Sequence, residues 1–106
     1  MPTRPKLAPI NRDRLGQFAE EWKARVLPLR RAHGFEIERA WTIAQSNQFA
    51  WVISYDGPER WEAKERAYYD SCERREMTPN PARLIARIEE YVVEDILCTL
   101  ARQNGA

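Results

Sequence analysis

The sequence predicts one small α+β domain in which an antiparallel sheet carries its helices on one face. Three observations support this fold class: a length of 106 residues, an apolar stripe at helical spacing in the first third, and two alternating segments joined by a polar turn. Hydrophobic residues make up 43% of the chain and charged residues 31%, the balance of a folded globular protein. We therefore expect a single domain over 1–106, with flexible ends at 1–6 and 102–106.

The first strand and the first helix occupy the N-terminal third. Three of the first ten residues are prolines, which cannot donate backbone hydrogen bonds, so we expect a short strand over 6–10 at or beside a sheet edge. Asn11 is a suitable N-cap for the helix that follows. The apolar residues of this helix recur at the spacing of one helical face: Leu15, Phe18, Ala19, Trp22, Val26 and Leu29. Pro28 predicts a kink, and His33-Gly34 predicts the end of the helix.

A β-hairpin follows the helix. Residues 35–42 alternate between apolar and polar side chains, whereas 49–55 are apolar on both faces, which places the second of these strands in the interior of the sheet. The polar segment between them, which contains Asn47, supplies the turn. Arg39 stands on the otherwise apolar face of 35–42, so its charge needs a partner: an acidic residue of the last strand, Glu94 or Asp95, or a second subunit.

The second half of the chain predicts two helices and a last strand. The segment 56–58, Asp-Gly-Pro, ends the hairpin and opens a helix. Asn80 caps a short helix that Pro81 opens and that runs to about Ile88, and the apolar residues of 91–97 predict the final strand. The resulting order, strand, helix, strand, strand, helix, short helix, strand, is that of a ferredoxin-like βαββαβ domain.

The aromatic content predicts a partner for the uncovered face of the sheet. Four Trp, four Tyr and three Phe each bring about 150–250 Å² of surface, and a monomer of this size buries only about 60–65% of the surface its unfolded chain exposes. Helices can cover only one face of the sheet. We therefore expect a homodimer in which a second identical chain covers the other face.

Composition argues against several classes of function. The net charge of +1 indicates no general attraction to nucleic acid or to an anionic membrane. Two cysteines without CxxC spacing and a single histidine disfavour a metal site, and four scattered glycines make no phosphate loop. No apolar run reaches the roughly 18 residues that a membrane span needs. We therefore expect a cytoplasmic protein with no metal, no cofactor, no nucleic-acid partner and no membrane contact.

Short segments spread over the chain carry a family resemblance. They are Leu-Pro-Leu-Arg-Arg-Ala-His-Gly-Phe at 27–35, Ala-Trp at 40–41, Asn47, Phe-Ala-Trp-Val at 49–52, Tyr-Asp-Gly-Pro at 55–58, and Tyr-Tyr-Asp-Ser-Cys-Glu-Arg at 68–74. Together, over about residues 7–97, they resemble the NIPSNAP family of the dimeric α/β-barrel superfamily. The sequence departs from the family pattern in its proline-rich first strand and in Cys72, which stands where proline is common.

The resemblance implies a homodimer and a cavity between the sheet and the helices. It implies no single chemistry, because related dimeric barrels include cofactor-free monooxygenases, cyclases, haem-handling enzymes and non-catalytic proteins. Aromatic walls suit a flat, largely apolar aromatic ligand of polyketide-like kind. The residues that we expect to bind such a ligand are Trp22, Trp41, Trp51, Tyr55, Tyr69 and Arg74.

Three residues have both a catalytic or binding interpretation and a structural one. His33 is the only histidine and hence the candidate general acid or base, although a histidine before a glycine also suits a helix end. Tyr68 can donate a hydrogen bond to a developing oxyanion, although Tyr68 and Tyr69 also read as one buried and one rim ring. Arg74, with Glu73, can bind a ligand that bears a carboxylate, although a solvated ion pair or a cap-like loop anchor is the favoured interpretation of this segment.

Two functions stay open at this point. The first is a NIPSNAP-like protein that binds or transforms a small aromatic molecule without a cofactor, which requires an aromatic cavity. The second is a non-catalytic homodimeric interaction module, which requires an interior without a cavity and a surface with a polar groove or an exposed apolar patch. The sequence does not decide whether the protein is an enzyme.

Overall fold

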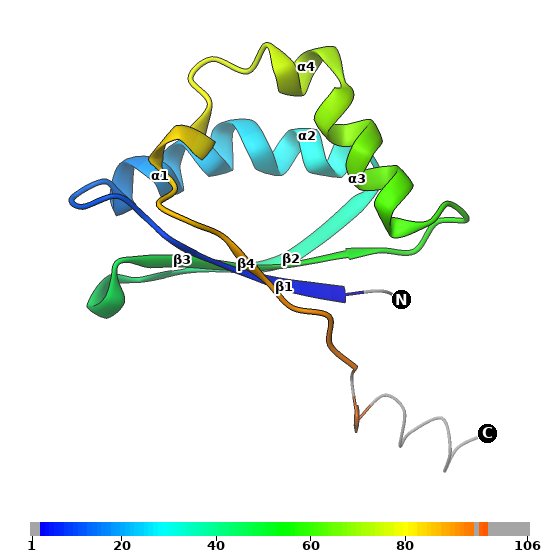
Figure 1. Cartoon of the computed structure of the whole chain (residues 1–106), viewed down its shortest axis with the longest axis horizontal. Coiled ribbons are helices and arrows are strands. Elements are labelled where there is room, and N and C mark those ends of the chain that lie inside the picture. Colours follow the sequence, from blue (N-terminus) through cyan, green and yellow to red (C-terminus); the bar gives the residue numbers. More distant parts are fainter. Residues whose placement is uncertain (1–2, 95, 98–106) are drawn as a thin grey trace.

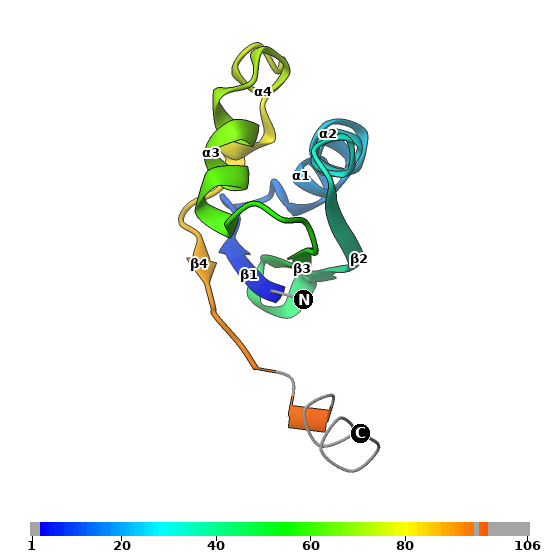
Figure 2. The same cartoon turned by 90° about the vertical axis from the view of Figure 1, so that its right-hand side faces the viewer.

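The computed structural model of the chain describes residues 3–94 and 96–97. It contains a four-stranded antiparallel sheet in the order β2-β3-β1-β4, with helices α1 to α4 on one face, as Figure 1 and Figure 2 show. The strands are β1 Thr3–Pro9, β2 Phe35–Ile43, β3 Gln48–Tyr55 and β4 Glu89–Glu90. The predicted βαββαβ ferredoxin-like fold is confirmed.

Strand β1 is longer than predicted and begins at Thr3, so residues 3–6, which we expected to be flexible, are paired. Pro5 and Pro9 are accommodated because both turn toward the segment 86–91, which contains the short strand β4. The Pro5 carbonyl accepts from the Tyr91 N–H and the Pro9 carbonyl accepts from the Ala86 N–H, at 3.0 and 2.8 Å. A strand residue points its N–H and C=O to the same side, so the missing N–H groups cost the β1–β3 ladder nothing.

The first helix is one continuous rod of three parts, α1 Leu15–Glu21, a π-helical segment η1 Trp22–Val26, and α2 Leu27–Ala32 (Figure 1). The kink predicted at Pro28 is replaced by this π turn, in which the Leu27 N–H donates to the Trp22 carbonyl. The wider turn leaves room for the proline ring after it. The helix ends as predicted, because Gly34 has a φ of 88°.

The π turn also moves the buried stripe. An extra residue in one turn shifts every later position around the helix axis, so Arg30 is buried where regular spacing predicts Leu29. Arg30 is only 3% exposed, whereas Leu29 is partly buried.

The second half contains shorter elements than predicted. Helix α3 runs over Trp61–Asp70 and α4 over Cys72–Arg75. A 3-10 turn, η3, follows over Pro81–Leu84. In the first half of the chain, another 3-10 turn, η2 over Ala44–Ser46, closes the β2–β3 hairpin. Asn80 caps η3 as predicted, its Oδ1 accepting from the Ala82 N–H at 3.0 Å.

The predicted final strand over 91–97 is wrong in its described part. Strand β4 is only Glu89–Glu90, and residues 91–94 form no strand: the chain leaves the sheet after Tyr91, whose N–H still donates to the Pro5 carbonyl (Figure 1). Their side chains are exposed, with Val92 at 81%. Apolar, β-branched composition therefore did not suffice, because a strand also needs a neighbour to pair with. Asp95, Cys98 and 102–106 lie outside the described residues.

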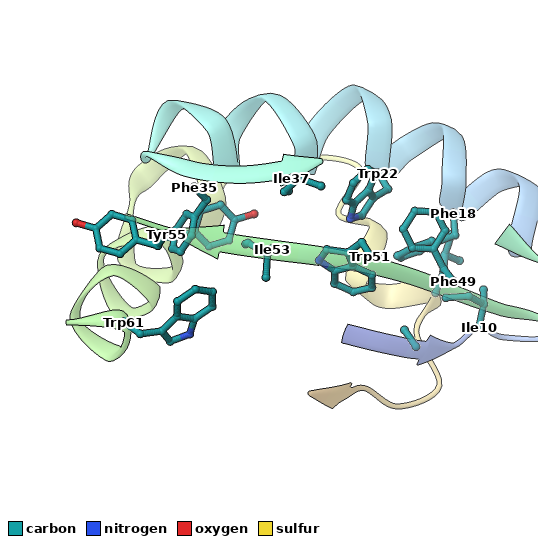
Figure 3. Close-up of a cluster of buried hydrophobic side chains, with 13 residues drawn as sticks. Ile10, Phe18, Trp22, Phe35, Ile37, Phe49, Trp51, Ile53, Tyr55 and Trp61 are labelled. Carbon is teal, nitrogen blue, oxygen red and sulfur yellow. The ribbon is translucent and has the colours of Figure 1, made fainter. Parts of the chain in front are cut away.

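The core lies between the sheet and the helices. Figure 3 shows its aromatic side chains in a row along the inner face of the sheet. Phe49 packs against Phe18 and Trp22 with ring centroids 5.0 Å apart in both pairs, and Phe35 packs against Trp61 at 5.6 Å. None of the helices within residues 3–94 and 96–97 is long and apolar enough to span a bilayer.

Candidate functional site

A small cavity of about 60 Å³ lies where the first helix, the end of α3, α4 and η3 meet over the sheet. It brings together five of the eight residues predicted for the site: Trp22, Trp51, Tyr68, Tyr69 and Arg74. The other lining residues are Phe18, Val26, Arg30, Asn80, Pro81, Ala82, Ile85 and Ile88.

The helix or strand that carries each predicted side chain explains how the side chain reaches the cavity. Trp22 comes from the π segment and Trp51 from the inward-facing series of β3, and their rings lie 6.0 Å apart. Tyr68 and Tyr69 come from the last turn of α3, with their rings edge to face at 5.1 Å. Tyr68 is 1% exposed and Tyr69 is 42% exposed, so one ring forms the wall and the other the rim.

Two guanidinium groups flank the tyrosines. The Arg30 Cζ lies 3.8 Å from the Tyr68 ring centroid, and Arg30 also pairs with Glu65 and donates to the Tyr69 hydroxyl at 3.2 Å. The Arg74 Cζ lies 5.1 Å from the Tyr69 ring centroid. Both distances fall in the range of cation–π contacts. Arg30 is therefore neutralised by a carboxylate, whereas Arg74 faces aromatic rings.

The Tyr68 hydroxyl stays protonated at neutral pH. Burial raises the pKa of the Tyr68 phenol, and the nearby charges of Arg30 and Arg74 oppose that shift without cancelling it. A neutral phenol can donate a hydrogen bond. The structure therefore keeps Tyr68 in the state that its predicted role needs.

Trp22 holds an unpaired donor. Its side chain lines the cavity, and its Nε1–H is buried without a hydrogen-bond partner among the described residues. A buried unpaired donor costs about 1–3 kcal/mol. The Nε1–H of Trp61, at the other end of the core, is in the same state and is not part of this cavity.

Three predicted residues lie outside the cavity lining. His33 ends α2 and touches the site only through Tyr68, with ring centroids 5.5 Å apart and edge to face. Tyr55 lies at the end of β3 and donates its hydroxyl hydrogen bond to Glu59. Trp41 is 44% exposed and pairs across β2–β3 with Ala50. The predicted set of eight is thus not one site.

Two buried cations, Arg30 and Lys6, were not predicted from the sequence. Lys6 is 3% exposed, and its Nζ lies 3.2 Å from Glu90 and 3.6 Å from Glu65. The sequence did carry a signal for Lys6: it alternates with Ala8 in β1 and with Ile10 just after the strand, and residues two apart in an extended chain share a face. For Arg30 there was no such signal, because the π turn moves it onto the buried stripe.

The lining suits hydrogen-bond donation and not proton abstraction. Within the described residues, no Asp, Glu, His or Lys side chain lines the cavity. Searched over the same part of the chain, no group of three or more His, Cys, Asp or Glu residues is arranged to hold a metal ion.

The fold is similar to that of solved NIPSNAP structures. A NIPSNAP domain protein from Burkholderia xenovorans superposes with a TM-score of 0.76 at 13% identity, over 90% of this chain and 94% of that one. A NIPSNAP family protein from Agrobacterium tumefaciens superposes with a TM-score of 0.77 at 7% identity, over 88% and 90%. The resemblance stated from the sequence is thereby confirmed as a resemblance of fold.

A second group of solved structures shares the fold at somewhat greater distance. An antibiotic biosynthesis monooxygenase superposes with a TM-score of 0.64 at 8% identity, over 90% of this chain and 98% of that one. The sequence itself matches no protein-family model and no curated protein. At these identities the similarity establishes the fold and no activity.

Proposed function

We propose that the chain is a NIPSNAP-like protein that binds a small, largely apolar aromatic molecule, without a cofactor, in the cavity between the sheet and the helices. The observation that carries the proposal is the convergence of Trp22, Trp51, Tyr68 and Tyr69 on one cavity. Such walls gain affinity from burial, and a few polar tips fix the orientation of the ligand.

The size of the cavity limits how a ligand is held. Its volume of about 60 Å³ is well below the roughly 300–1,000 Å³ of pockets that enclose drug-sized ligands. Only one end of an aromatic molecule fits inside. The remainder lies at the mouth, against Tyr69, Ile85 and Ile88, of which Ile88 is 51% exposed.

Any chemistry at this site would begin with hydrogen-bond donation. Tyr68 is the group in contact with the cavity that suits the predicted role, since a protonated phenol can stabilise an oxyanion. A role of His33 as acid or base stays a prediction and would act through Tyr68. Binding is therefore the primary proposal, and transformation of the ligand is secondary to it.

The second candidate function is a non-catalytic homodimeric interaction module. It is favoured by the face of the sheet that α1 to α4 leave uncovered, where Trp41 is 44% exposed. We propose homodimerisation through this face under either function, and a cytoplasmic location stays a prediction from the sequence.

A thermal-shift screen of aromatic metabolites tests the binding proposal. At ten times Kd, a ligand specific for the folded state raises the free energy of unfolding by about 1.4 kcal/mol, roughly 5–10 °C in Tm for a domain of this size. We expect one chemical class to give a saturable shift of this order.

Two substitutions of alanine by tryptophan test whether the ligand binds in this cavity. Ala82 and Ala86 are both exposed, and only Ala82 lines the cavity. We expect Ala82→Trp to abolish the ligand-induced shift by obstructing the cavity, and Ala86→Trp to retain it. The proposal fails if no compound stabilises the folded protein, or if both variants respond to the ligand alike.

A further inference from the structure

The polar side-chain groups of Trp22, Tyr68 and Arg74 that line the cavity can donate hydrogen bonds. The Trp22 Nε1–H has no partner among the described residues, and the Tyr68 hydroxyl and the Arg74 guanidinium, which interact with each other through a side-chain hydrogen bond, still offer N–H and O–H groups to the cavity. The acceptor best placed to compete, the Asn80 side-chain oxygen, is already engaged by the Ala82 N–H at 3.0 Å. A ligand that satisfies this wall must therefore bring hydrogen-bond acceptors.

The two arginines of the wall differ in charge balance. Arg30 is paired with Glu65, which lies beside it. Arg74 makes no ion pair with any described residue, and its backbone N–H, not its side chain, is held by the Ser71 hydroxyl at 3.2 Å. A half-buried guanidinium that faces Tyr68 and Tyr69 is a positive charge without a counter-charge in this part of the chain. A ligand acceptor that is negatively charged would supply it.

The cavity has the size of an acidic head group. A volume of about 60 Å³ is several times the roughly 10–15 Å³ that one buried water molecule needs, so the cavity has room for a few heavy atoms. A carboxylate, with three heavy atoms, matches that space, and an aromatic ring does not fit beside it. The mouth is apolar at Ile85 and Ile88, where a ring can lie.

We infer that the ligand is a small aromatic monocarboxylate that enters carboxylate first, with its acidic group at Arg74, Tyr68 and Trp22 and its ring at the mouth. This inference rests on the proposed binding function, and it names the class of ligand that the same cavity takes. The planar guanidinium suits it, because two parallel N–H groups can hold both carboxylate oxygens.

Matched acid and amide pairs test the inference directly. The probes are benzoate, phenylacetate and 3-phenylpropionate, each compared with its primary amide, and the readout is Kd by titration calorimetry at pH 7. The amide keeps the shape of the acid and lacks its charge. A hydrogen bond to a charged group contributes about 1.5–3 kcal/mol, so we expect at least one acid to bind about tenfold or more tightly than its amide.

The arginine pair of α4 provides a variant and its control. Arg74 and Arg75 are neighbours on the same short helix, and only Arg74 lines the cavity. We expect Arg74→Gln to remove the preference for the acid and Arg75→Gln to keep it. Trp22→Phe removes the indole donor while keeping an aromatic ring, and it should weaken the acid more than the amide. Melting curves of each variant show that it is folded.

The outcomes separate this inference from the proposed function. Equal affinity of acid and amide, or an acid preference that survives in Arg74→Gln, overturns the carboxylate assignment while binding of aromatic molecules stands. If neither acids nor amides bind and the screen of aromatic metabolites is also negative, both proposals fail.

Discussion

Asn47 connects the β2–β3 turn to the end of β1. Its φ of 54° lies in the left-handed region, which asparagine tolerates better than most residues. Its Nδ2 donates to the Ile10 carbonyl at 2.6 Å and to the Asn11 carbonyl at 3.3 Å, and its own carbonyl accepts from the Ile10 N–H at 3.0 Å. The side chain and the main-chain carbonyl of Asn47 together satisfy the backbone where β1 ends.

Two substitutions separate the conformation of Asn47 from its hydrogen bonds. Asn47→Gly keeps the positive φ and loses the side-chain bonds, so we expect it to lower the free energy of unfolding by about 1–2 kcal/mol. Asn47→Ala loses the same bonds and adds left-handed strain, so we expect about 1 kcal/mol more. Urea unfolding measures both. Equal values for the two variants would contradict the role assigned to the backbone.

At this scale the sequence predicts what acts locally. Asn47, Asn80 and Gly34 were identified because a turn, a cap or a helix end is decided within a few residues. Arg30 is brought to the buried stripe by the π turn, and Lys6 shares a face with Ala8, but the carboxylates that make the burial of both cations possible, Glu65 and Glu90, lie 35 or more positions away. Such pairings appear only once the fold brings the elements together.

Ion pairs hold strand β4 to β1 more than the short backbone pairing between them does. It pairs over two residues only, Lys6 with Glu90 and Leu7 with Glu89. Glu90 forms ion pairs with Arg4 at 2.9 Å and with Lys6 at 3.2 Å. Burial alone would raise the pKa of Glu90, but the hydrogen bonds and charges of Arg4 and Lys6 outweigh burial and lower it.

This lowered pKa predicts a loss of stability in acid. A native carboxyl that binds its proton more weakly than the unfolded chain stabilises the fold above the unfolded pKa, near 4.5. That contribution is lost as the pH falls through the lower native pKa. We expect stability to drop below about pH 4.5, and Glu90→Gln to reduce the size of that drop.

Urea midpoints between pH 7 and pH 3 measure the effect, with Glu36→Gln, an exposed position on β2, as control. Because the pKa values of Glu21, Glu59 and Glu89 are also lowered, only the difference between wild type and variant isolates Glu90. Parallel curves for wild type and Glu90→Gln would refute the assignment.

Helices and strands were predicted correctly where the hydrophobic periodicity extends over many residues. The prediction failed where pairing with a neighbouring strand decides the structure. The stripe of the first helix and the alternation of β2 and β3 extend over many residues, and these elements were found. The final strand was placed over 91–97 on apolar composition. It formed instead at Glu89–Glu90, where β1 offers two positions and two cations.

At the scale of the whole molecule, a single chain buries most of its aromatic side chains. Three of the eleven, Trp41, Tyr69 and Tyr91, are exposed by more than 40%, and the other eight are buried in the one-sided core. From the sequence, a thin core was expected to leave part of this aromatic surface to a partner. A row of tilted and edge-to-face rings fills one layer, so the core holds more aromatic residues than expected.

The case for a partner therefore rests on the uncovered face of the sheet. Inward-facing Trp51 alternates with Ala50 and Val52, so these two lie on the outer face. Across the ladders Ala50 pairs with Trp41 and with Leu7. The outer face thus presents a row of apolar side chains, and packing against the sheet of a second copy would remove it from water.

Homodimerisation is predicted to depend on Trp41. Light scattering should give twice the 12.5 kDa of one chain for the wild type at micromolar concentration. Trp41→Glu places a charge in the apolar row and should give the mass of a monomer, because a buried unpaired carboxylate opposes association. Tyr69 is a matched control, since it is 42% exposed against 44% for Trp41 and lies on the helix side of the sheet. Tyr69→Glu should remain a dimer, whereas a wild type of monomer mass would leave the outer face without the partner proposed for it.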